Sequence, residues 1–184
     1  MKIKYRIEIL SDWHIGSGLD SGSEADALVL KDENSLPFIP GKTLKGLFKN
    51  ALQEISEVQP EVITREDIHR IFGGNTKGDK TIKGKAFFNN AELTDDDKKE
   101  IIANNLSSHL YRNIASTKIN KNGVAEKSSL RTIEVCIPVN LEGEIIVSDE
   151  KAKTIMRKAF MWTRHIGVSR NRGLGRCRII TINE

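Results

Sequence analysis

The sequence is poor in cysteine, in aromatic residues and in long apolar runs. Its two cysteines, Cys136 and Cys177, stand far apart, so neither a disulfide framework nor a paired-thiol zinc site is expected. No apolar run approaches the roughly 18 residues that a membrane span needs. The first residues, MKIKYRIEIL, alternate charged and apolar side chains, which is unlike a signal peptide. We therefore expect a soluble, cytoplasmic protein with no membrane partner.

Proline is also scarce, at 4 of 184 residues, whereas glycine, at 14, has its usual frequency. With 38% apolar and 29% charged residues, the composition is globular and excludes collagen-like and disordered chains. The length is close to that of one domain, at roughly 150 residues per domain. We expect residues 1–184 to form a single domain.

Positive charge is concentrated in two segments of the chain. The whole sequence has 29 basic and 25 acidic side chains, a net charge of +4. Residues 112–131 carry +4 and residues 151–184 carry +8, whereas residues 132–150 between them carry −5. Clustered lysine and arginine supply most of the affinity for a phosphate backbone, so a polyanion held at defined places is one interpretation. A solvated basic tail is the other.

Hydrophobic spacing predicts an α+β protein. Alternation predicts strands at 2–10 and 177–182, and apolar residues three and four apart predict helices after Gly41 and at 149–164, capped by Thr43 and Ser148. The other predicted elements are short extended pieces at 27–31 and 36–39, a helix at 64–72 capped by Thr64, a loop at 73–84, a strand at 85–93, a short helix or turn at 95–104, an exposed hairpin or arm at 111–130, and an antiparallel pair at 131–139 and 144–147 that turns at 141–143.

Without its loops, the predicted order is strand, helix, strand, strand, helix, strand. This is the order of a ferredoxin-like or RNA-recognition-type sheet, in which two helices pack on one face. We therefore expect an α+β fold of this kind, with loop insertions and a thumb-like hairpin.

The sequence Gly41-Lys42-Thr43 before a predicted helix matches the end of a phosphate-binding loop. That loop also needs a glycine five residues before its last glycine, and position 36 is leucine, so an ATPase is not favoured. Gly41, Thr43 and Lys45 would still lie at a helix N-terminus, where free amides favour an anion. A helix cap with solvent-facing lysines explains the same residues.

A basic glycine-rich segment, Arg172-Gly173-Leu174-Gly175-Arg176, precedes the last strand and is flanked by Arg170 and Arg178. Glycine lets backbone amides approach a ligand, and arginine binds phosphate with two hydrogen bonds. In a segment of net charge +8, this pattern favours RNA or another polyanion. Because aromatic residues are only 5% of the chain and few lie in the basic segments, we expect base stacking to contribute little.

Candidate catalytic residues are few. The four histidines share no metal-ligand spacing, so a zinc site is not expected. His14 follows the first strand, where a side chain can face a ligand, although a structural hydrogen bond to the loop explains it more simply. The acidic candidates for phosphodiester cleavage are Asp20, Glu24, Asp26 and Asp32. Solubility of the loop accounts for the same acids.

Three stretches together resemble the RAMP superfamily, in particular the backbone subunits of type III CRISPR effector complexes. Between residues 13 and 52, the motifs HIGSG, ADALVLKD and LPFIPGKTLKGLFKNAL are similar to the family's signature, with Thr43 where the family often has serine. RNIASTKINKNGVAEKSSLRTIEV resembles its thumb hairpin, at about 111–131 here. SRNRGLGRCRI resembles its glycine-rich loop, at about 167–176.

This resemblance implies a subunit that binds CRISPR guide RNA, assembles with other subunits and copies of itself, and cuts target RNA. Motif position assigns the cut to Asp26, with Mg²⁺ or another divalent cation as cofactor, and neither Asp20 nor Glu24 matches that position. A carboxylate there could hold the metal or position the attacking 2′-hydroxyl. The expected RNA-contacting residues are His14, Lys42, Thr43, Lys45, Arg112, Lys118, Lys121, Arg131, Arg170, Arg172, Gly173, Gly175 and Arg176.

Three alternatives stay open at this point. One is a stand-alone RAMP ribonuclease that processes CRISPR repeat RNA and uses His14 for proton transfer. The second is a RAMP subunit that binds RNA without cutting it. The third is a ferredoxin-like protein-interaction module, which leaves the basic glycine-rich segment without a role.

Overall fold

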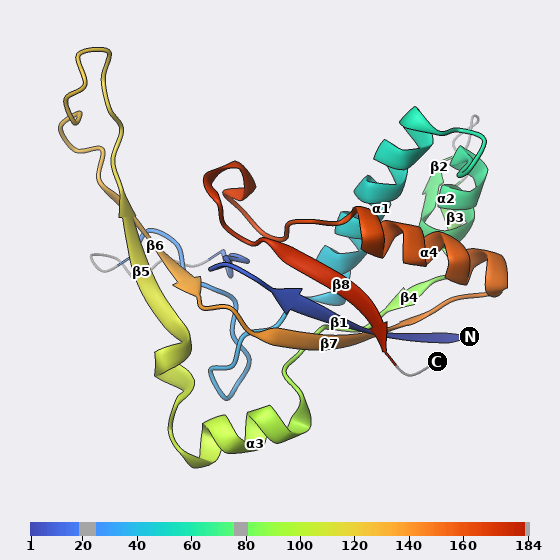
Figure 1. Ribbon diagram of the computed structural model, residues 1–184, viewed down its shortest axis with the longest axis horizontal. Helices are drawn as coiled ribbons and strands as arrows, with labels where there is room; N and C mark the ends of the chain where they lie inside the picture. Colours follow the sequence, from blue (N-terminus) through green and yellow to red (C-terminus); the bar gives the residue numbers. More distant parts are fainter. Residues whose placement is uncertain (19–24, 76–80, 183–184) are drawn as a thin grey trace.

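The computed structural model describes residues 1–18, 25–75 and 81–182. Its main sheet is antiparallel, with the strand order β4-β7-β1-β8. These strands are β1 (Lys2–Ile9), β4 (Phe87–Phe88), β7 (Asn140–Ile146) and β8 (Cys177–Ile182). Helices α1 (Gly41–Val58) and α4 (Glu150–Trp162) pack together on one face (Figure 1). This strand order confirms the predicted ferredoxin-like arrangement.

The core lies between this face of the sheet and the two helices. β1 is the central strand, and its alternate residues Ile3, Tyr5, Ile7 and Ile9 are at most 4% exposed. The aromatic rings of Tyr5, Phe48 and Phe160 meet there, with centroids 5.0 to 6.0 Å apart. Packing of three aromatic rings from β1, α1 and α4 therefore holds the helices on the sheet.

The remaining elements are connections between these strands and helices. They are α2 (Arg65–Phe72), β2 (Gly73–Asn75), β3 (Thr81–Lys83), α3 (Asp95–Ala103), the 3₁₀ turns η1 (Ser107–Leu110) and η2 (Arg170–Arg172), β5 (Tyr111–Ser116) and β6 (Arg131–Cys136). No helix in the described part of the chain is long and apolar enough to cross a membrane.

Strands β5 and β6 form the base of an arm that extends away from the body of the protein (Figure 1). The arm, residues 117–130, lies where the sequence predicts an exposed hairpin. Its tip turns around Asn120, whose side-chain oxygen accepts hydrogen bonds from the amides of Asn122 and Val124 at 2.9 and 3.1 Å. The turn therefore depends on a local side-chain bond rather than on burial.

The predicted pairing of residues 131–139 with 144–147 is wrong. β6 pairs with β5 instead, and β7 pairs with β1 and β4. The residues predicted to turn, 141–143, lie inside β7, where Glu142 pairs with Arg6 and Gly143 lies opposite Tyr5. Alternation identifies a strand but not its partner, because several strands have the same period.

Four smaller expectations also need correction. The predicted loop at 73–84 contains the paired strands β2 and β3, and the predicted strand at 85–93 is regular only at Phe87–Phe88. Thr43 lies inside α1, which begins at Gly41. The cap of α4 is Asp149 rather than Ser148, because Asp149 accepts from the amide of Ala152 at 2.9 Å. α1 begins at Gly41 because this residue packs closely on β4. Ser148 does not cap α4 because its hydroxyl donates to Asp149 Oδ2 at 2.6 Å.

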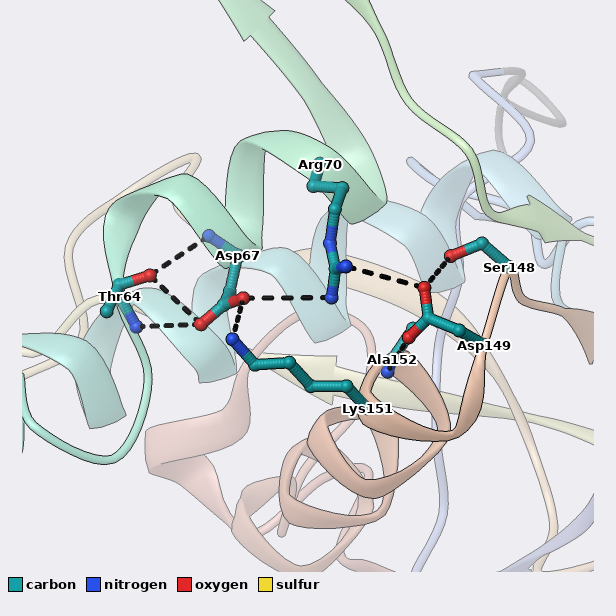
Figure 2. A network of polar contacts seen from close by, with 7 residues as sticks. All are labelled: Thr64, Asp67, Arg70, Ser148, Asp149, Lys151 and Ala152. Carbon is teal, nitrogen blue, oxygen red and sulfur yellow. Dashed lines mark hydrogen bonds and ion pairs between the residues drawn. The ribbon is translucent and has the colours of Figure 1, made fainter.

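A buried carboxylate joins α2 to the start of α4 (Figure 2). Asp67 forms the predicted capping box with Thr64, at 2.9 Å between the hydroxyl and the carboxylate, and accepts from Lys151 Nζ at 2.7 Å. Arg70 bridges Asp67 to Asp149 at 3.7 and 3.4 Å. Burial raises the pKa of Asp67, but the hydrogen bonds from Lys151 and Thr64 outweigh it and hold that pKa below its usual value.

Asp67→Asn should therefore lower the free energy of unfolding at neutral pH by about 2 kcal/mol. The folded-state pKa of Asp67 is depressed, so its carboxylate stabilises the protein above the unfolded-state pKa of about 4. That contribution is lost as the pH falls through the folded-state pKa. Urea unfolding at pH 7 and at pH 3 should show a gap between variant and wild type that narrows in acid. Glu66→Gln, an exposed neighbour, is the control, and an undiminished gap in acid would contradict the linkage.

Candidate nucleic-acid interface

The arm and the glycine-rich loop are both fastened to the loop after β1, residues 10–18. On one side, Trp13 and Cys136 of β6 exchange backbone hydrogen bonds of 2.9 and 2.8 Å. On the other side, the amide of Gly175 donates to the carbonyl of Asp12 at 2.7 Å. Segments more than a hundred residues apart in the sequence thus meet at one end of the main sheet.

Two glycines allow the glycine-rich loop to lie against its neighbours. Gly167 has φ +73°, and a Cβ there would lie 2.1 Å from the carbonyl oxygen of His14. Gly175 has φ +68°, and its Cβ would lie 1.9 Å from the carbonyl oxygen of Ile166. Both positions therefore require glycine for packing. Gly173 differs, because it is exposed and a Cβ there would have no atom within 4 Å.

The arginines of this loop are available to a ligand. Arg170, Arg172 and Arg176 are all exposed. None of the three is paired with a carboxylate in the part of the chain that the structure describes. Arg178, by contrast, forms an ion pair with Glu8 at 2.7 Å. The loop therefore presents three unpaired guanidinium groups, the side chain that best recognises phosphate.

The start of α1 supplies two further cations. Gly41 packs so closely on β4 that a Cβ would lie 2.0 Å from the carbonyl oxygen of Phe88, and its amide donates to Asn90 Oδ1 at 3.0 Å. The glycine of the Pro-Gly-Lys motif thus serves packing, and one amide expected to attract an anion is already used. Lys42 is exposed and Lys45 half-buried. Both lie within two turns of Leu47 on α1, which lines a pocket together with Arg170 and Asn171 of the glycine-rich loop.

The predicted RNA-contacting residues of the arm and of the strands at its base are of two kinds, those already in an ion pair and those without one. Arg112 forms an ion pair with Asp12, and Lys118 pairs with Glu126 at 2.9 Å. Lys121 and Arg131 are exposed and are without a carboxylate partner among the described residues. Lys121 at the tip and Arg131 at the base are therefore the cations of the arm that the fold leaves free.

Asp26 lies at the base of the arm. It is exposed, its Oδ2 accepts from the amide of Thr132 at 2.7 Å, and its own amide donates to the Thr132 carbonyl at 2.7 Å. Glu134, two residues further along β6, accepts from the Val29 amide at 2.9 Å and from Lys31 Nζ at 2.7 Å. The segment that carries Asp26 is thus fastened along β6. Sequence reasoning missed Glu134, whose only signal was an acid within the predicted strand.

His14 and the other acidic candidates lie elsewhere. His14 is 3% exposed, and its Nδ1 donates to the carbonyl of Glu134 at 2.6 Å, so direct contact with RNA would require this packing to open. Asp32 accepts from the amides of Asn34 and Leu36 and so holds a turn. Asp20 and Glu24 lie outside the described residues.

Asp26 provides one carboxylate rather than a complete metal site. Among the described residues, no three histidine, cysteine, aspartate or glutamate side chains gather as they would around a metal ion. Mg²⁺ at phosphate-processing sites is commonly held by one or two carboxylates together with substrate phosphates. The second oxygen of Asp26 fits that role, provided that RNA supplies the other ligands.

Comparison with known proteins identifies the family. The model of the RAMP superfamily matches residues 6–178. The chain belongs to the RAMP superfamily. This confirms the resemblance on which the sequence predictions depend. No curated protein matches this RAMP chain.

Solved structures contain chains with the same fold as this RAMP protein. One is a chain of the type III-B Cmr-beta complex bound to cognate target RNA, with a TM-score of 0.73 and 12% identity over 98% of this chain and 97% of that one. Another is from the apo state of the type III-B Cmr-beta complex, with a TM-score of 0.73 and 12% identity over 100% and 98% of the two chains. At this identity, the similarity shows the shared fold.

Gly175→Ala in this RAMP protein should cost about 3 kcal/mol of stability or more. The left-handed backbone costs a non-glycine residue roughly 1–2 kcal/mol, and the clash with the Ile166 carbonyl adds to it. Gly173→Ala is the matched control, since it has positive φ but open space around it and should lose only the first contribution. Chemical denaturation measures both variants. Equal losses would contradict the close packing at Gly175.

Proposed function

We propose that this RAMP protein is a guide-RNA-binding backbone subunit of a type III CRISPR effector complex. Its partners would be guide RNA, target RNA, other subunits and copies of itself. The observation that carries the proposal is that the glycine-rich loop, with its unpaired arginines, and the base of the arm are fastened to the same loop after β1, while α1 lines a pocket with the glycine-rich loop. Chains of the same fold occur in type III-B complexes, one of them bound to target RNA.

The rest of the sheet surface supports this choice of RNA-binding end. On the face away from the helices, three of the four basic side chains of β1 and β8 are paired with glutamates of neighbouring strands. The three ion pairs are Lys2–Glu144 at 3.2 Å, Arg6–Glu142 at 2.8 Å and Arg178–Glu8 at 2.7 Å. A phosphate backbone gains most where cations are unpaired, so the end of the sheet attracts RNA more strongly than its open face.

Replacing Arg170, Arg172 and Arg176 together by alanine should weaken binding of single-stranded RNA at least about tenfold. Loss of three phosphate contacts should also reduce the slope of log affinity against log salt concentration by about 2. Affinity measured across a salt series checks both effects.

The matched control removes three positive charges from the opposite end of the sheet. Lys4, Lys83 and Lys85 are exposed there, on β1, β3 and the chain that enters β4, and are in no ion pair among the described residues. Their replacement by alanine should leave the affinity and its salt slope nearly unchanged. Equal losses in the two triple variants would show attraction by net charge alone and would refute a defined RNA site.

Within this function, Asp26 is the candidate for target cleavage. Its carboxylate is exposed at the base of the arm, and one oxygen is in no hydrogen bond or ion pair among the described residues. A divalent cation would supply charge stabilisation at the scissile phosphate, and Asp26 would hold it or orient the attacking hydroxyl. The bond from the Thr132 amide fixes the carboxylate relative to the arm.

Asp26→Asn should reduce cleavage of complementary target RNA in Mg²⁺ by about 100-fold or more in the assembled complex. The amide can still accept the hydrogen bond from Thr132, so the arm keeps its anchor and the affinity for guide and target should be unaffected. Glu33→Ala, an exposed acid nearby, is the control and should cut normally. Cleavage by Asp26→Asn at the wild-type rate would leave a subunit that binds without cutting.

The repeat-processing alternative receives no support from the position of His14. A general acid or base must reach the proton that it transfers, and His14 is buried with one ring nitrogen bonded to the backbone of β6. A protein-interaction module would leave the unpaired arginines of the glycine-rich loop without a role. RNA binding accounts for them directly.

A further inference from the structure

A pocket of about 220 Å³ lies between α1 and the chain that leaves α4. It is lined by Leu47, Asn50, Ala51, Glu54, Trp162, Thr163, Arg164, His165, Arg170 and Asn171. The last two residues belong to the glycine-rich loop, so the pocket adjoins the proposed RNA-binding surface. It is not used by any contact proposed above, apart from Arg170.

Trp162 provides a fixed aromatic wall. It is the last residue of α4 and is 46% exposed, which is unusual for the largest apolar side chain. Its Nε1 donates to Glu54 Oε2 on α1 at 2.7 Å. This bond satisfies the one polar atom of the indole and limits rotation of the ring. A ring held in place and open to solvent is suited to stacking against a flat partner.

Most of the other side chains around the pocket fall into three chemical groups. Leu47 and Ala51 on α1 are an apolar part of the lining, and Asn50 and Asn171 add amides that can both donate and accept. Arg164 and Arg170 are exposed and have no carboxylate partner among the described residues. An aromatic wall with amides and unpaired guanidinium groups matches the flat base, the polar base edge and the phosphate of a nucleotide.

We propose that this pocket binds one unstacked base of single-stranded RNA against Trp162, with the adjoining phosphate held by Arg164 and Arg170. The inference rests on the proposed RNA-binding function and assigns it a stacking contact, whereas composition alone predicts little stacking. A volume of about 220 Å³ lies below the roughly 300–1,000 Å³ of pockets that enclose whole small-molecule ligands. The pocket therefore suits a single base of a bound strand better than a free cofactor.

Tryptophan fluorescence tests this site directly. The chain has two tryptophans, and Trp13 is 0% exposed in the core, so a change in emission on adding ligand reports on Trp162. A short single-stranded RNA should quench the emission of the wild-type chain. Trp162→Leu should abolish the quenching and lower the affinity about 5- to 100-fold, the range for loss of one base–aromatic stack.

Two controls separate stacking from attraction to phosphate. The same strand without its bases should bind wild type and Trp162→Leu equally well and leave the emission of wild type unchanged. Met161→Ala alters the neighbouring residue, which is 72% exposed and does not line the pocket, and it should bind and quench like wild type. Trp162→Phe should restore most of the affinity, because it keeps an aromatic face.

The outcomes distinguish this site from the function on which it rests. RNA binding that depends on the loop arginines but does not change the emission would overturn the pocket and leave the proposed function standing. Wild-type affinity in Trp162→Leu would do the same. Quenching by a free mononucleotide but not by the RNA would make the pocket a small-molecule site and overturn the assignment. Absence of any RNA binding would refute both proposals.

Discussion

The structure depends on the clamping of one loop, the segment after β1, between β6 and the glycine-rich loop. Backbone hydrogen bonds hold this segment on both sides. The side chain of its residue Trp13 is fully buried and donates from Nε1 to the carbonyl of Ile137 at 3.1 Å. This approach is possible because Gly167 has no Cβ to meet the His14 carbonyl, and Gly175 has none to meet the Ile166 carbonyl within the chain that leads into the glycine-rich loop. The arm and the glycine-rich loop are thereby held relative to each other, which a surface that follows an RNA strand requires.

The positions of the acidic side chains determine which basic side chains of this protein are unpaired. Basic residues occur on every face, but three of the four on the open face of the sheet, and Lys151 beside α2, are paired with carboxylates. The arginines of the glycine-rich loop, and Lys42 at the start of α1, have no such partners in the described chain. Acidic residues therefore decide which cations can bind phosphate, because a paired cation must give up its partner first.

Much of the fold follows from the sequence alone. The capping box at Thr64, the strand at 177–182 and the two long helices all result from interactions between near neighbours in the chain. The ferredoxin-like order follows from the sequence of those elements. The partner of β6 does not, because its alternation fits β5 and β7 equally well. β7 is excluded only because its two edges already pair with β1 and β4. The same limit applies to the start of α1, which a contact with β4 sets.

The sequence by itself determined the elements, the segregation of charge and the motifs of the RAMP superfamily, since each is a local pattern. Only the tertiary structure decided which of the residues so marked are available. It buries His14, pairs Arg112 with Asp12, and leaves Arg131 and the loop arginines free. It also brings Glu134 to the segment of Asp26, and Trp162 to Glu54. These contacts join residues roughly a hundred positions apart, and their distances are set by strand pairing and helix packing, which no local pattern encodes.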